Sequence, residues 1–165
     1  MSLRVSIHAA WAQAGRAVQD RLLGIGIGVP ASVVLGIARS LEADSSGVGT
    51  HTQLGLGACS VLSATGWPCP MCGMTTTFTH LAHGAIGSAI TTQPFGVVLF
   101  AATVLLAGAG LADAFWPAGR LRRLAAWAQQ RELPLALFVL AGMGFGWAYK
   151  AWLMGKFAAS AVPSP

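Results

Sequence analysis

The sequence predicts an all-α integral membrane protein with about three transmembrane helices and short amphipathic surface helices. Of its 165 residues, 55% are hydrophobic and only 9% are charged. Soluble domains carry about 25% charged residues, so this composition suits lipid better than water. Three apolar runs are long enough to cross a hydrocarbon core of roughly 30 Å. The chain length suits one compact domain, and we expect a single membrane domain over residues 22–156.

The three apolar runs define the expected spans, which cover residues 22–41, 95–116 and 133–155. Pro30 would kink the first span, a distortion that helices in a bilayer tolerate. No small-x-small cleavage site follows this run, so we expect a retained span and not a signal peptide. In the third span, Gly142 and Gly146 form a small-x-x-x-small pair that could allow close helix approach.

Amphipathic and polar segments flank the spans. Residues 1–21 place apolar side chains at helical spacing, which predicts an amphipathic N-terminal segment lying in the interface. Residues 118–132 predict a basic amphipathic connector, with Arg120, Arg122, Arg123 and Arg131 against Glu132. We expect residues 157–165 to form a disordered tail. Asp113 lies near the end of an apolar run, where we expect an interfacial position with Arg120 or Arg123 nearby.

The distribution of basic residues predicts the orientation of the chain. The 42–68 loop has no Lys or Arg, whereas the 118–132 connector has four arginines. The positive-inside rule then places the N-terminus and the connector in the cytoplasm, and residues 42–94 on the outer side. Lys150 and Lys156 would also lie outside. The net charge of +5 bears on orientation and anionic lipid, and no aromatic-plus-basic pattern predicts nucleic acid as a partner.

The segment from 42 to 94 carries the most distinctive motif. A Gly-rich loop over residues 42–68 is followed by Cys69-Pro70-Met71-Cys72-Gly73 and a short predicted helix over residues 72–90. The chain has three cysteines, Cys59, Cys69 and Cys72. This odd number leaves one thiol unpaired unless a metal or a partner takes it.

Three chemistries fit these cysteines, the first being metal binding. In a Cys-Pro-x-Cys-Gly turn, which is similar to the knuckle of zinc ribbons and rubredoxins, proline stiffens the turn and glycine allows tight backbone geometry. Cys59 would be the third ligand of a zinc ion. The fourth would be His80, with His83 and His51 as alternatives, or a second copy of the chain would supply a second knuckle.

The other two chemistries are redox exchange and a structural role. Cys72 opens the predicted helix, whose N-terminus favours a thiolate, so the Cys69–Cys72 pair could serve a membrane thiol oxidoreductase. In the structural interpretation the cysteines staple or pack the turn, with Cys59 bonded to one of the others or with all thiols buried. We find no Ser-His-Asp or paired-carboxylate arrangement, so a non-enzymatic membrane module is favoured over a hydrolase.

Residues 51–100 resemble a known family of small bacterial membrane proteins, domain of unknown function family 2752. The resemblance rests on Cys69-Pro70, on Cys72-Gly73-Met74-Thr75, on His83-Gly84 and on Gln93-Pro94. Many members have arginine after the first threonine, where this chain has Thr76. The resemblance implies a membrane location and a helical fold. We expect the chain in a bacterial inner membrane, with the bilayer and another membrane protein or a second copy of the chain as partners. It implies no particular activity.

Overall fold

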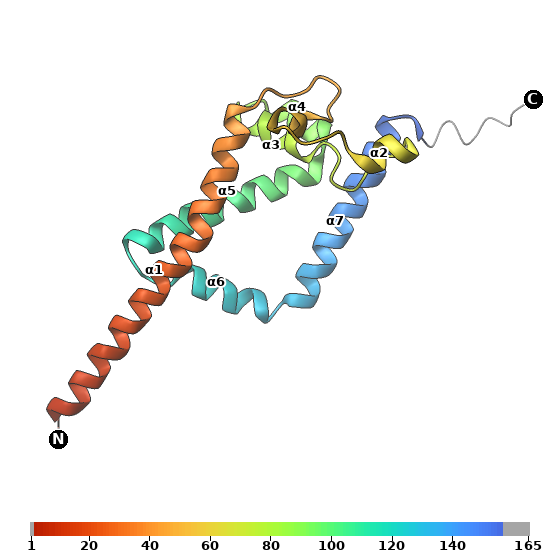
Figure 1. The fold of residues 1–165 in the computed structure, drawn as a ribbon. Coiled ribbons are helices and arrows are strands. Elements are labelled where there is room, and N and C mark those ends of the chain that lie inside the picture. Colours follow the sequence, from red (N-terminus) through yellow and green to blue (C-terminus); the bar gives the residue numbers. More distant parts are fainter. Residues whose placement is uncertain (1, 157–165) are drawn as a thin grey trace, which may run out of the picture. The chain divides into compact units, whose positions relative to one another are not determined.

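The prediction of an all-α fold is confirmed. The computed structural model describes residues 2–156, with side chains from residue 13 onward, and this part of the chain contains seven α-helices, one 3-10 helix and no strand (Figure 1). The expected disordered tail at 157–165 lies outside the described residues. The elements are α1 (Ser2–Ser40), η1 (Thr50–Leu54), α2 (Ser60–Thr65), α3 (Met74–Ala82), α4 (Ile86–Thr92), α5 (Pro94–Phe115), α6 (Arg120–Gln129) and α7 (Glu132–Leu153).

Three helices are long and apolar enough to cross a membrane: Gln13–Ser40 within α1, α5 and α7. Their large apolar side chains are widely exposed, for example Leu22 at 65%, Leu105 at 72% and Leu140 at 66%. Contiguous apolar surface of this extent is unfavourable in water and is satisfied by lipid. The first span does not follow a separate N-terminal element, because α1 runs without a break from Ser2 to Ser40.

The polar segment between the first two spans folds into four short elements. Where we expected one helix over residues 72–90, the structure has α3 and α4. The break occurs at Gly84, whose φ of 79° is left-handed and ends the helical path. In the preceding loop, which was expected to be irregular, η1 and α2 are short helical turns. Each ends at a left-handed glycine, Gly55 or Gly66.

The chain divides into two compact units. The first comprises Met1–Val34 and Ala102–Glu132, and the second comprises Leu35–Ala101 and Leu133–Pro165. In the second unit, Gly142 lies against the ring of Phe95 and Gly146 lies against the side chain of Gln93. These two glycines of α7 therefore make room for side chains.

In the first unit, α1 and α5 approach each other closely through glycines. A Cβ atom placed on Gly28 would lie 2.7 Å from the backbone nitrogen of Leu111, and one on Gly24 would lie 2.6 Å from the carbonyl oxygen of Gly110. Real Cβ atoms do not approach backbone this closely, so only glycine permits the contact. Small residues of this kind bring the backbones of membrane helices together.

Two buried aspartates in α1 and α5 pair with partly exposed arginines. Asp113 is completely buried, and its carboxylate accepts a hydrogen bond from the Leu121 N–H at 2.9 Å and pairs with Arg120 at 3.1 Å. This agrees with the expected partnership with Arg120, and it supplies the opposite charge that a buried acid requires. Asp20 is also buried and pairs with Arg122 at 2.6 Å.

The close contact between α1 and α5 predicts a position-specific effect of adding one methyl group. We expect Gly110→Ala to lower the free energy of unfolding by about 1–3 kcal/mol, because its Cβ would overlap the backbone of Gly28. Thermal or denaturant unfolding in detergent measures the change. Gly108→Ala is the matched control, since a Cβ at Gly108 meets nothing within 4 Å. Equal effects of the two substitutions would contradict the close contact.

Candidate metal centre

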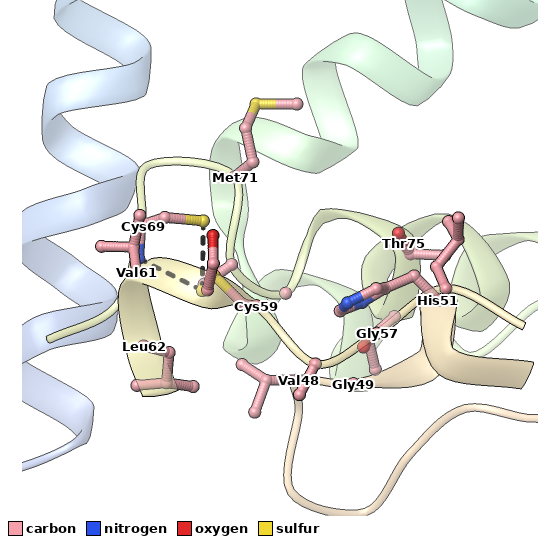
Figure 2. Close-up of a pocket in the computed structure, with 16 residues that line it drawn as sticks. Val48, Gly49, His51, Gly57, Cys59, Val61, Leu62, Cys69, Met71 and Thr75 are labelled. Carbon is pink, nitrogen blue, oxygen red and sulfur yellow. Dashed lines mark hydrogen bonds between the residues drawn. The ribbon is translucent and has the colours of Figure 1, made fainter. Parts of the chain in front are cut away.

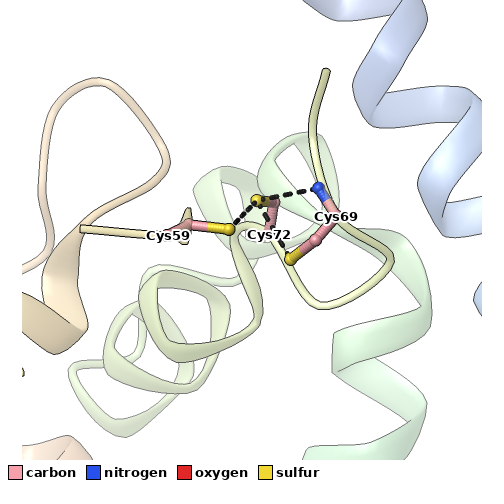
Figure 3. A group of neighbouring side chains, drawn as sticks. All are labelled: Cys59, Cys69 and Cys72. Atoms are coloured by element: carbon pink, nitrogen blue, oxygen red, sulfur yellow. Dashed lines mark hydrogen bonds between the residues drawn. The ribbon is translucent and has the colours of Figure 1, made fainter. Parts of the chain in front are cut away.

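Three cysteines from two separate stretches of the chain meet in the second unit. Cys59 is the residue before α2, and Cys69 and Cys72 lie in the turn before α3. The Sγ atoms of Cys69 and Cys72 are 3.2 Å apart, and those of Cys72 and Cys59 are 3.7 Å apart. All three sulfurs lie within 4.8 Å of one another and point toward one another (Figure 3). We call these three residues the cysteine cluster.

Backbone geometry shapes the turn that carries two of the cysteines. The N–H of Cys72 donates to the carbonyl of Cys69 at 3.0 Å, and the N–H of Cys69 donates to the sulfur of Cys72 at 3.2 Å. Gly73 follows with a left-handed φ of 89°. A Cβ there would lie 2.9 Å from the carbonyl oxygen of Gly47, so glycine is required both for the conformation and for the space.

Two side chains from outside the turn fix the prolines on either side of Cys69. The indole N–H of Trp147 on α7 donates to the carbonyl of Pro68 at 2.8 Å. The amide of the buried residue Gln93 donates to the carbonyl of Pro70 at 3.5 Å. The position of the first motif cysteine therefore depends on contacts with α7 and with the residue that precedes α5.

The sulfur positions fit a tetrahedral thiolate site. A zinc ion with Zn–S bonds of about 2.3 Å separates its sulfur ligands by about 3.8 Å. The two shorter separations, 3.2 and 3.7 Å, and the upper limit of 4.8 Å bracket this value. Small side-chain rotations would suffice to place the cysteine cluster around one ion. Three thiolates are also the kind of ligand that zinc and other soft metal ions prefer.

The environment gives the thiols different acidities. Burial, together with the neighbouring Cys69 thiol, raises the pKa of Cys72 to about 12. A backbone N–H of Leu62 in α2 lowers the pKa of Cys59. We expected the N-terminus of a helix to favour a Cys72 thiolate. That expectation is wrong because α3 begins only at Met74 and Cys72 is buried at 6% exposure.

A pocket of about 640 Å³ borders all three cysteines. His51 lines this pocket, and Figure 2 shows its ring extending from η1 into it. Two left-handed glycines, Gly49 and Gly55, flank η1. The buried Thr50 anchors η1 to α3 through a 2.8 Å hydrogen bond between its hydroxyl and that of Thr76.

The structure does not bring His80 or His83 to the cysteine cluster. No histidine of the described residues, His51 included, has a ring nitrogen in the group formed by the three sulfurs. For His80 the reason is that α3 is continuous from Met74 to Ala82. Six residues of helix carry His80 about 9 Å along the axis from Met74. The ring of His83 is engaged elsewhere, with Nδ1 2.8 Å from the carbonyl of Thr79 and Nε2 2.9 Å from the guanidinium of Arg39.

The remaining motif residues lie in or next to the turn. Pro70 is exposed, and Met74 is buried at the start of α3. Thr75 lines the same pocket as the cysteines and lies near His51 (Figure 2). Thr76, at the position where many members of the resembling family have arginine, is buried and makes the contact with Thr50.

One family model matches part of the chain. Residues 59–107 match the model of a family described as protein of unknown function, DUF2752. The match confirms the resemblance that the sequence motif predicted, and it contains the whole cysteine cluster. No curated protein and no solved structure matches the chain.

The unequal acidities predict an order of alkylation in the metal-free, reduced protein. Only thiolates react rapidly, and with a pKa of about 12 the Cys72 thiol is ionised in about one molecule in 10,000 at pH 8. We expect iodoacetamide to modify Cys59 well before Cys72 between pH 7 and 9, as measured by mass spectrometry of peptides. Modification of Cys72 first would contradict the described burial.

Proposed function

We propose that the cysteine cluster holds a zinc ion in a non-enzymatic membrane module. The observation that carries this proposal is the meeting of three sulfurs, within 4.8 Å of one another, from two segments that α2 separates. When bound, the ion would supply a strong link between the start of α2 and the start of α3. The module would lie in a bacterial inner membrane with the cluster on its outer side, as the distribution of basic residues predicts.

His51 is the best-placed fourth ligand within this proposal. Zinc in structural sites is almost always bound by four ligands, and the cluster supplies three. His51 lines the same pocket as the cysteines, and its ring makes no hydrogen bond within the described part of the chain that would hold it elsewhere. Its ring lies outside the group formed by the three sulfurs, so ligation would require η1 to move toward the cluster. The sequence-based choice, His80, would require α3 to unwind.

A structural centre also accounts for the contacts around the turn. Trp147 and Gln93 donate hydrogen bonds to the carbonyls of Pro68 and Pro70. A rigid turn would therefore keep the loop that contains η1 and α2 in a fixed position relative to α7. A fixed polar surface of this kind suits a component of a larger membrane complex or a pair of identical chains. Such a role requires no catalytic group in the described part of the chain.

The redox alternative uses the same atoms differently. The 3.2 Å approach of the Cys69 and Cys72 sulfurs favours formation of a disulfide by an external oxidant. The high pKa of Cys72 opposes its use as the attacking thiolate near neutral pH and would leave that role to Cys69. We place a thiol oxidoreductase second because a redox pair needs two sulfurs, whereas three meet here.

Zinc binding by variants of the purified protein tests the proposal. In detergent, after metal removal and reduction, we expect the chain to take up about one zinc ion, measured by elemental analysis and by competition with a chromophoric chelator. Loss of an outer-shell partner weakens metal binding by roughly 10- to 100-fold. Substituting serine for any of the three cysteines removes a direct ligand, so we expect a larger loss of zinc affinity. His51→Ala should also weaken it, whereas the matched control His80→Ala should not.

Three results would change this interpretation. A reduced protein that takes up no zinc, and whose Cys69–Cys72 bond cycles readily between oxidised and reduced forms, would support the oxidoreductase. An inert disulfide to Cys59 would support a purely covalent staple. About one zinc ion for two chains, with His51→Ala silent, would indicate a site shared in a dimer.

A further inference from the structure

A lysine is buried next to the motif turn. Lys150 lies in the last turn of α7 and is only 4% exposed. Its ammonium donates to the carbonyl of Gly47 at 2.9 Å and is 3.5 Å from the carbonyl of Thr92. The two ion pairs found among the described residues use Arg120 and Arg122, so neither supplies a carboxylate to this lysine.

A buried ammonium with only neutral partners is costly. Removing a charge from water costs several kcal/mol even after the protein relaxes, and neutral carbonyls offset only part of that cost. Ionisable residues in membrane-spanning segments are rare and pair with one another or with backbone carbonyls. A negative charge near Lys150 would offset the rest of the cost, and neither ion pair among the described residues supplies one.

The nearest candidate for that charge is the cysteine cluster. The ammonium of Lys150 lies 3.4 Å from where a Cβ of Gly73 would be, and Gly73 directly follows Cys72. A thiolate at Cys72, as in a metal-bound cluster, would be close enough to interact with this ammonium. The carbonyl oxygen of Gly47 contacts both the Lys150 ammonium and Gly73.

Counting charges shows what the cluster would present. A divalent ion bound by three thiolates has a net charge of −1, and a neutral histidine as fourth ligand leaves this value unchanged. One ammonium then makes the centre and the lysine together neutral. Without the lysine, no cation would offset the charge on the side of the buried Cys72.

We propose that Lys150 is the fixed counter-charge of an anionic metal centre with three thiolate ligands. Its positive charge favours this set of ligands over a set with two thiolates, which would make the centre neutral. The inference rests on the proposed function. Lys150 acts through the ligands and does not itself bind the ion. Its role is electrostatic, and its hydrogen bond to Gly47 positions the ammonium.

Zinc affinity of the full-length, purified protein tests this role. We expect Lys150→Met and Lys150→Gln each to weaken zinc binding by about 10- to 100-fold, the range measured for outer-shell partners. Gln keeps a donor for the Gly47 carbonyl but lacks the charge, so a loss in both variants identifies charge as the cause. Lys156→Met is the matched control, because its ammonium lies beside Gly66 and not beside the motif turn.

A double-mutant cycle separates the electrostatic role from a structural one. Cys59→His would convert the loaded centre from a charge of −1 to neutral. In that background we expect Lys150→Gln to change zinc affinity by less than about threefold, because no excess negative charge remains to be offset. Thermal unfolding of each metal-free variant shows whether it folds. If Lys150→Gln does not fold, Lys150→Met takes its place in the cycle.

The outcomes distinguish this inference from the proposal on which it rests. If the unmodified protein takes up no zinc, the proposed function fails. If it binds zinc and the Lys150 variants bind equally well, the metal centre stands and the counter-charge role is wrong. Equal losses with Cys59 present and in the Cys59→His background would show that Lys150 only supports the fold.

Discussion

The turn from Cys69 to Gly73 connects several segments of the second unit. The turn closes through its own Cys69–Cys72 backbone hydrogen bond, and Trp147 and Gln93 hold the two proline carbonyls. Gly73 then lets the chain pass within contact of Gly47. If this turn moved, the sulfur of Cys59 would lose its neighbours, and η1 would no longer face the same pocket.

The polar groups around this turn form a consistent electrostatic arrangement when the cluster is occupied. A buried ammonium is unfavourable in isolation, and so is a thiolate at the buried Cys72, whose pKa of about 12 keeps it neutral without a metal. A divalent cation lowers the pKa of coordinating thiols so that they bind as thiolates. The resulting anionic centre and the ammonium of Lys150 then stabilise each other. Neither group is explained as well by an inert disulfide, which is neutral.

The coarse fold follows from composition and hydropathy. The three spans were predictable because about 20 apolar residues are needed to cross a bilayer, and the chain has three such runs. The Asp113–Arg120 pair was also predictable, since an acid at the end of a span needs a nearby cation. The glycines that bring α1 and α5 together were not identified, because 21 glycines give many small-residue pairs and only packing distinguishes them.

The candidate site was only partly predictable. The odd number of cysteines and the knuckle-like turn pointed to all three members of the cluster. Whether His51 or His80 is the better candidate for the fourth ligand depends on how the Gly-rich loop folds back toward α3. The spacing of residues along the chain does not reveal this. Lys150 gave no signal, because a lysine near the end of a span ordinarily extends to the interface, and its burial depends on contacts with residues up to 103 positions away.

X-ray absorption at the zinc edge of the metal-loaded protein tests the central claim most directly. The account predicts a first coordination shell of three sulfurs at about 2.3 Å and one nitrogen at about 2.0–2.1 Å. The nitrogen contribution should be replaced by oxygen in His51→Ala and should persist in His80→Ala. A shell made only of nitrogen and oxygen, or one with fewer than three sulfurs, would contradict a metal centre built on Cys59, Cys69 and Cys72.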